Sequence, residues 1–122
     1  MTRIAMTVCC TIALAGCAGT PEAPDVMRDD AVAIAPYAIH EACAKLGPGD
    51  RLEYRYTSHE PVSFNIHYHE GAAVVTPIQR EQSREDAGIY APTLEQGYCL
   101  MWEAGAAGTT LAYEARVRRG AR

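Results

Sequence analysis

The sequence predicts a mainly β protein whose one small domain is an antiparallel β-sandwich, preceded by a signal peptide and a tether. Three observations predict this fold class. Apolar and polar residues alternate with a period of two in several short segments, turn residues separate these segments, and the loops between them are too short for crossover helices. Since parallel α/β folds need such helices, we expect antiparallel strands in two facing layers, at residues 37–118.

The N-terminus has the features of a bacterial lipoprotein signal. An apolar run at residues 4–15 follows Arg3 and is far shorter than the roughly 20 residues of a membrane-spanning helix. The run ends in Leu14-Ala15-Gly16-Cys17, which resembles a lipobox. An ordinary secretory signal whose cleavage site includes a cysteine is the alternative.

The lipobox resemblance implies a lipid anchor at Cys17. Residues 1–16 would be removed as the signal peptide, and the Cys17 thiol would carry a diacylglycerol beside an acylated amino terminus. Ala18, rather than an aspartate, follows this cysteine, which implies an outer-membrane location facing the periplasm. The membrane is then a partner of the protein through Cys17.

The charge balance argues against nucleic acid as a partner. Without the signal peptide, 10 of the 11 Lys and Arg remain against 15 Asp and Glu, a formal charge of −5 that gives no steering toward phosphate backbones. The basic residues gather near the C-terminus, at Arg116, Arg118, Arg119 and Arg122. We expect these side chains to be solvated; contact with anionic lipid headgroups is the alternative.

Two of the five cysteines are expected to pair. Cys9 and Cys10 leave with the signal and Cys17 is lipidated, so Cys43 and Cys99 remain. An oxidising compartment and a small domain both favour a disulfide between them. A redox-active pair or a metal–thiolate site is less favoured, because the two cysteines do not form a C-x-x-C motif.

The first part of the mature chain gives weaker signals. Residues 17–30 contain Pro21 and Pro24 without apolar periodicity, which predicts a flexible, hydrated tether. Residues 31–46 are ambiguous, because alanines favour a helix that Pro36 would interrupt, while the residues after Tyr37 fit a strand equally well. The glycines and proline at 47–50 then predict a turn.

Period-two alternation predicts the strands that follow, together with the residues that face the core. The expected inward residues are Leu52, Tyr54 and Tyr56 in one strand, Val62, Phe64, Ile66 and Tyr68 in a second, Tyr98, Leu100 and Trp102 in a later one, and Leu111, Tyr113, Ala115 and Val117 in the last. We expect short strands at 74–76 and 89–90, a polar loop at 79–87, and a hairpin turn at 105–108 that links the last two strands.

Several of these segments together resemble a GOLD domain, the lumenal β-sandwich of transmembrane cargo adaptors. The resemblance covers about residues 37–117. It rests on Cys43, the tyrosine-rich strand at 52–56, the run at 61–68, Gly88-Ile89-Tyr90-Ala91-Pro92, and the segment Gly97-Tyr98-Cys99-Leu100-Met101-Trp102. It implies a sandwich, a Cys43–Cys99 bridge and a non-catalytic binding module. Trp102 stands where the family commonly has an asparagine, and a lipobox replaces the membrane helix, so the resemblance implies nothing about cargo.

His67 and His69 form an H-x-H motif on a predicted strand. The period of two places both imidazoles on the same outward face, about 6 to 7 Å apart. Neutral imidazoles suit zinc or copper, but a site needs further ligands, for which His59, Asn65, Met101 and Glu103 are the candidates. Solvated surface histidines are the alternative. His40 is expected to be structural or exposed.

The sequence lacks the motifs of the common nucleophilic, nucleotide-binding and zinc-protease sites. Six aromatic residues are expected to pack in the core rather than line a ligand cleft; they are Tyr54, Tyr56, Tyr68, Tyr98, Tyr113 and Trp102. We therefore expect a lipid-anchored cell-envelope binding or structural module that has no catalytic activity and no cofactor, and whose partner is an envelope protein or glycan. A metal-binding envelope protein that uses His67 and His69 is the alternative, and a small hydrolase comes third.

Overall fold

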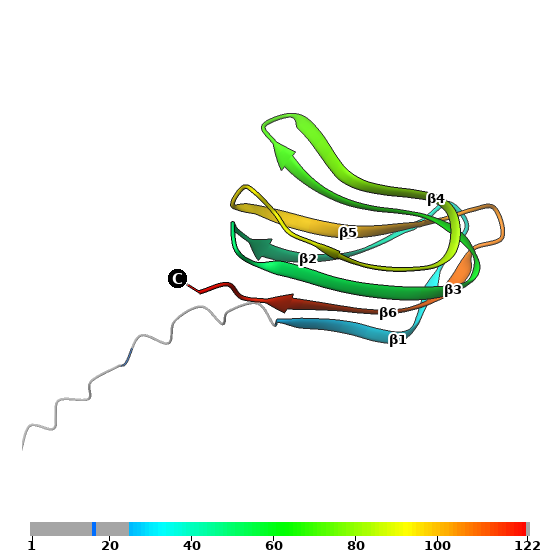
Figure 1. The fold of residues 1–122 in the computed structure, drawn as a ribbon. Helices are drawn as coiled ribbons and strands as arrows, with labels where there is room; N and C mark the ends of the chain where they lie inside the picture. Colours follow the sequence, from blue (N-terminus) through cyan, green and yellow to red (C-terminus); the bar gives the residue numbers. More distant parts are fainter. Residues whose placement is uncertain (1–15, 17–24, 122) are drawn as a thin grey trace, which may run out of the picture.

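The computed structural model describes residue 16 and residues 25–121. Within this part the chain contains no helix and forms six antiparallel strands joined in one sheet (Figure 1). The strands are β1 (Val26–Ile34), β2 (Ile39–Leu46), β3 (Arg51–Glu70), β4 (Ala73–Tyr90), β5 (Gln96–Ala104) and β6 (Thr109–Arg118).

The long hairpin of β3 and β4 takes part in both layers of the fold. Residues 51–58 of β3 pair with β6, whereas residues 62–67 pair with β5. β4 pairs with β3 in both regions, and register shifts between Thr57 and Val62 mark the bend. The sheet thus curls so that its two halves face each other, and the predicted mainly β sandwich is confirmed (Figure 1).

We name the two layers by their strands. The first half-sheet contains β1, β6, residues 51–58 of β3 and residues 85–90 of β4. The second half-sheet contains β2, β5, residues 62–70 of β3 and residues 73–83 of β4. The connections at 35–38, 47–50 and 91–95 each carry the chain from one half-sheet to the other.

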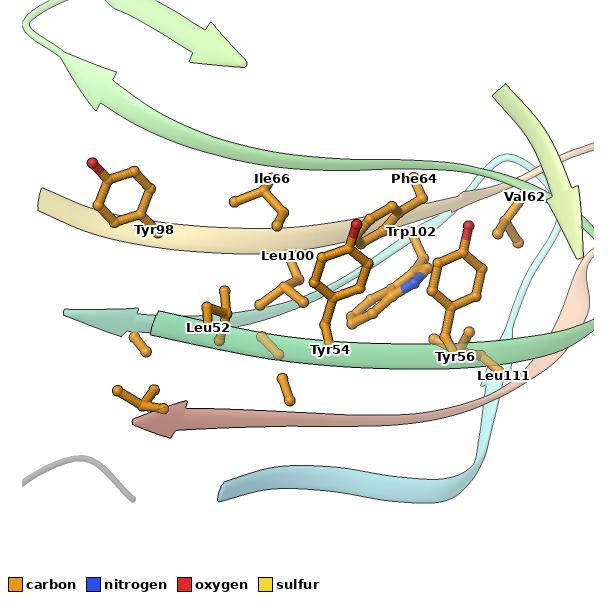
Figure 2. Close-up of a cluster of buried hydrophobic side chains, with 14 of the residues drawn as sticks. Leu52, Tyr54, Tyr56, Val62, Phe64, Ile66, Tyr98, Leu100, Trp102 and Leu111 are labelled. Carbon is orange, nitrogen blue, oxygen red and sulfur yellow. The ribbon is translucent and has the colours of Figure 1, made fainter. Parts of the chain in front are cut away.

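The core lies between the half-sheets and consists of the residues that the alternation places inward. Figure 2 shows Tyr54 and Tyr56 projecting from β3 toward Phe64 and Trp102 of the opposite layer. The Tyr56 ring centroid is 4.8 Å from that of Phe64 and 5.9 Å from that of Trp102. The large fully buried side chains are Trp102, Tyr98, Phe64, Leu46, Leu52, Ile66, Leu100, Leu111 and Val62. The prediction that these aromatic residues pack in the core is confirmed for Tyr54, Tyr56, Tyr68, Tyr98 and Trp102, and Tyr113 packs against the core while half-buried.

The ambiguous segment at 31–46 is extended on both sides of Pro36. β1 and β2 flank a turn at 35–38, in which the Ala38 N–H donates to the Ala35 carbonyl at 3.0 Å. β1 already begins at Val26, so residues 26–29, which the sequence placed in the tether, pair with β6 instead. The sandwich therefore begins before residue 37.

The predicted polar loop at 79–87 was wrong, since these residues belong to β4 and pair with β3. β4 is an edge strand, and most of its residues are exposed on both faces. A strand in this position needs no apolar alternation, which explains why the sequence pattern missed it. The short strands expected at 74–76 and 89–90 are the two ends of this one strand.

The predicted hairpin at 105–108 was also wrong. The turn itself is present, and the Gly108 N–H donates to the Gly105 carbonyl at 3.1 Å. However, β5 pairs with β2 and β3, whereas β6 pairs with β1 and β3. The turn therefore joins the two half-sheets instead of two neighbouring strands.

Candidate functional site

The outer face of the second half-sheet carries the disulfide. Cys43 of β2 and Cys99 of β5 are directly opposite each other and are bonded. His67 of β3 is the partner of Cys99 on its other side, so the three residues form one row across the strands. Cys43 is exposed at the edge strand. The predicted pairing of these cysteines is confirmed.

His67 is held by neighbours on the same face. Its side chain is buried, and its Nδ1 donates to the Asn65 Oδ1 at 2.8 Å. Its Nε2 lies 3.6 Å from the Glu41 Oε1. The His69 ring lies perpendicular to it, with centroids 5.4 Å apart, as expected for two imidazoles on one face. Both ring nitrogens of His67 therefore face protein partners.

The candidate further ligands do not complete a metal site with the two histidines. Asn65 hydrogen-bonds to His67, and on β5 Met101 lies opposite Asn65 while Glu103 lies opposite Ser63. His59 lies at the bend, where its carbonyl accepts a hydrogen bond from Arg84. Within residues 25–121, no three His, Cys, Asp or Glu side chains are placed to hold a metal ion. Zinc or copper binding stays a prediction without a completed site.

His40 has a structural position, one of the two alternatives expected for it. It lies on the inner side of β2, where its Nε2 is 3.3 Å from the Tyr113 Oη and its ring stacks 6.0 Å from that of Trp102. Burial, followed by the charge of Asp29, raises the pKa of the Tyr113 phenol. The His40–Tyr113 contact links β2 of one half-sheet to β6 of the other.

A different surface, on the outer face of the first half-sheet, contains a hollow that sequence reasoning missed. Its volume is about 280 Å³, and it is lined by Arg28, Asp30, Arg55, Tyr56, Thr57, Ala112, Tyr113 and Glu114. A second hollow of about 450 Å³ adjoins it and shares Arg55 and Glu114. We call this outer surface the arginine face; its arginines are Arg28, Arg51, Arg55, Arg116 and Arg118.

The local backbone explains the first hollow. The register of β1 shifts between Asp29 and Val32, opposite Ala112 of β6. The Asp29 Oδ1 accepts a hydrogen bond of 3.0 Å from the Ala31 N–H and stabilises this bulge. The side chain of Ala112 is only a methyl group, and that of Thr57 beside it is also small. The longer side chains around these two residues therefore form the sides of the hollow.

Ion pairs connect the charged side chains of the arginine face. Arg28 lies 3.2 Å from Asp30, and Glu114 lies 3.5 Å from both Arg55 and Arg116. The arginines outnumber the carboxylates here, which are Asp30, Glu53, Glu85 and Glu114. On the remaining described surface carboxylates are in excess, so the charge of the protein is distributed unevenly.

The two ends of the described chain meet at one end of the sandwich. Asp50 is 2% exposed, and its carboxylate accepts hydrogen bonds of 3.0 Å from the Gly47 and Gly120 N–H groups. Arg119 lies 3.4 Å from this carboxylate and 3.0 Å from that of Asp25. This terminal latch of Asp25, Gly47, Asp50, Arg119 and Gly120 brings the start of β1 and the end of β6 together at one end of the fold (Figure 1).

Cys17, the predicted lipidation site, lies outside the described residues. Among those that are described, none forms an apolar helix of membrane-spanning length.

Comparison with known proteins does not assign the chain to a family. Its sequence matches no family model and no curated protein. Any function must therefore be argued from the surfaces described above.

Proposed function

We propose that this protein is a lipid-anchored module of the cell envelope that binds a partner through its outer faces and catalyses no reaction. The acyl chains on Cys17 would hold it to the membrane, and residues 18–24 would join this anchor to β1. The partner would be an envelope protein, a glycan or the membrane surface itself.

The observation that carries this proposal is the exposed disulfide. Cys43 and Cys99 join an edge strand to its neighbour on the outer face, where solvent and small thiols can reach Cys43. A disulfide in such a position persists in an oxidising compartment, whereas the cytosolic thiol pool would keep an accessible pair reduced. This supports the export that the lipobox resemblance implies.

The contacts of His40, His67 and Asp50 favour a binding role over a catalytic one. His40 contacts Tyr113 and Trp102, His67 contacts Asn65 and Glu41, and the buried Asp50 belongs to the terminal latch. These groups support the fold, and the two described hollows lie on an outer face and are lined in large part by charged side chains. Such surfaces suit recognition better than catalysis, which uses water-excluded clefts.

Mass spectrometry of the native protein tests the anchor. We expect a chain that begins at Cys17 and carries the mass of a diacylglyceryl group and an amide-linked acyl chain. A Cys17→Ser variant, the matched control, should lose both additions and leave the membrane fraction. A native protein with an uncut leader or an unmodified Cys17 would overturn the proposed anchor.

Crosslinking in intact envelopes tests the binding role. A photoreactive residue at Thr57 on the arginine face, or at Ser63 on the disulfide-bearing face, should capture a discrete envelope protein, glycan or lipid. A photoreactive residue at Gln82, on edge strand β4, is the control for chance encounters. Equal, diffuse labelling from all three positions would contradict recognition by an outer face.

A further inference from the structure

We propose that the hollow between Arg28 and Arg55 binds the phosphoethanolamine headgroup of membrane phospholipids, a zwitterion with a phosphate and a primary ammonium. The inference rests on the proposed membrane location. It adds a headgroup-specific contact of the folded domain to the acyl anchor.

The shape of the hollow suits a small polar group. β1 and β3 form its rims, and Ala112 of β6 forms its floor because the β1 bulge leaves this methyl group uncovered. The bulge is supported by the hydrogen bond between Asp29 and the Ala31 N–H. Its volume of about 280 Å³ exceeds that of a headgroup of this size, so one headgroup fits with part of its hydration.

The charges of the hollow match both ends of the zwitterion. Arg28 and Glu114 are direct cross-strand neighbours, and so are Glu114 and Arg55, so a carboxylate stands between two guanidinium groups. Guanidinium groups bind phosphate oxygens in bidentate fashion. The carboxylates of Glu114 and Asp30 can accept hydrogen bonds from a primary ammonium. A purely anionic ligand would leave these carboxylates unfavourably close to it.

The ion pairs present in the hollow are of a kind that a ligand can replace. The Arg28 and Asp30 side chains are 60% and 85% exposed, and Arg55 is 72% exposed. Exposed ion pairs contribute little to stability, since water screens them and both side chains lose freedom. Glu114 is only 22% exposed and contacts Arg55 and Arg116, so it keeps its position when Arg55 turns toward a phosphate.

The position of the hollow agrees with attachment to a membrane at Cys17. Asp25 directly precedes β1, and the eight peptide steps from Cys17 to Asp25 span at most about 29 Å. The rim residues Arg28 and Asp30 lie only about 10 to 17 Å further along the strand. An anchored chain can therefore place the arginine face against the headgroups, while the excess of carboxylates elsewhere disfavours other orientations on a membrane with anionic lipids.

A titration with water-soluble headgroups tests the proposal. Glycerophosphoethanolamine, added to the purified full chain, should shift the amide resonances of Ala112 and its neighbours with a dissociation constant of about 1 mM, as its few atoms permit. Glycerophosphocholine should bind at least about tenfold more weakly, because its quaternary nitrogen has no N–H group to donate. Equal binding of the two compounds would overturn the proposal.

Two further ligands test whether the hollow recognises the whole headgroup or only one part of its chemistry. Inorganic phosphate tests for a simple anion site, and glycine tests for a site that takes any small zwitterion. If either binds as tightly as glycerophosphoethanolamine, the headgroup assignment is wrong.

Variants test the location of the site. Ala112→Leu should fill the hollow without changing any charge and abolish the shifts, while Ala33→Leu, on the same face of β1 outside the hollow, should leave them unchanged. Arg28→Gln and Arg55→Gln should each weaken binding about tenfold, and Arg84→Gln on β4 should not. Unchanged binding in folded Arg28→Gln and Arg55→Gln would overturn the site even if Ala112→Leu failed to fold.

The titration does not depend on acylation, so the two proposals can fail separately. An unmodified Cys17 with intact headgroup binding would remove the anchor alone. An acylated Cys17 without headgroup binding would remove the hollow as a site and leave the anchor in place.

Discussion

Single residues of this protein show how tightly the side chains of the core are packed. Gly88 of β4 is directly opposite Tyr54 of β3 on the inner face. A Cβ atom at Gly88 would lie 2.7 Å from the Tyr54 Oη and 2.9 Å from its Cζ. The Tyr54 ring is buried, with its centroid 5.1 Å from that of Phe64, so it has little room to move. Because Gly88 has no side chain, the Tyr54 ring can pack directly over β4.

We expect Gly88→Ala to lower the free energy of unfolding by about 1 to 3 kcal/mol, because the added methyl group overpacks the core. Urea unfolding followed by circular dichroism measures this loss. Gly97→Ala is the matched control, since a Cβ there meets no atom within 4 Å, and its stability should be unchanged or slightly higher. Equal effects of the two variants would contradict the steric argument.

Tyr90 marks a second contact between the layers. Its ring centroid lies 5.4 Å from that of Tyr98. Burial raises the pKa of the Tyr90 phenol to about 12, and the hydrogen bond with Tyr98 acts in the same direction. The folded protein thus holds this proton more tightly than the unfolded chain, whose tyrosines titrate near the ordinary value of 10.0.

The corresponding stability is fully present below pH 10 and decreases as the pH rises from about 10 to about 12. We expect the free energy of unfolding to fall across this range, and the absorbance of tyrosinate to show a late-titrating group. Tyr90→Phe should remove that group and make the decrease less steep. A native Tyr90 that ionises near pH 10 would contradict the prediction.

At the scale of the strands, alternation predicted the inner faces because burial acts on every second residue of a covered strand. Leu52, Tyr54 and Tyr56 follow this rule, as do Tyr98, Leu100 and Trp102. The same logic fails for β4, whose edge position exposes both faces and permits a polar sequence. It also fails at the 105–108 turn, because a turn sequence does not encode whether the strands it joins will pair.

The surface features were also predicted to different extents, because some follow from the local sequence and others need distant strands to meet. Cys43 and Cys99 could be paired by elimination, and period two placed His67 and His69 on one face. The hollow was not predictable, because it requires a bulge in β1 to lie opposite Ala112 in β6, and these segments are far apart in the sequence. The burial of His67 likewise depends on neighbours from other strands.

The β2–β5 pair provides a prediction at this scale. The disulfide links residues 56 apart in the sequence, and by the chain-entropy model such a loop contributes about 4 kcal/mol to stability. We expect a Cys43→Ala and Cys99→Ala double variant to lose most of this amount in urea unfolding. The native protein under strong reductant should show a similar loss. A double variant with an unchanged midpoint would contradict the structural role of the bond.

For the whole molecule, the terminal latch joins the β2–β3 turn to both ends of the described chain. The Asp50 carboxylate is buried and accepts hydrogen bonds from Gly47 and Gly120. The close approach of Gly120 to Gly49 leaves no room for a Cβ, which would lie 2.5 Å from the Gly49 carbonyl oxygen. The latch thus depends on a charge and on the absence of a side chain.

We expect Asp50→Ala to lower the free energy of unfolding by about 3 kcal/mol, since it leaves the Gly47 and Gly120 N–H groups without their acceptor and removes one of the two carboxylates that pair with Arg119. Thermal and urea unfolding measure the loss. Asp30→Ala, whose side chain is exposed, should change stability by about 0.5 kcal/mol or less. If the Asp50 variant were as stable as the Asp30 variant, the latch would have no energetic role.

The shared β3–β4 hairpin also has a consequence for how the molecule opens. Because the same two strands run through both layers, neither layer can detach and leave the other with an intact hydrogen-bond ladder. We therefore expect the amides of Leu52 and Ile66, one in each layer, to exchange with deuterium through one global opening event and to show the same protection. Different protection at these two amides would mean that the layers behave as separate cooperative units.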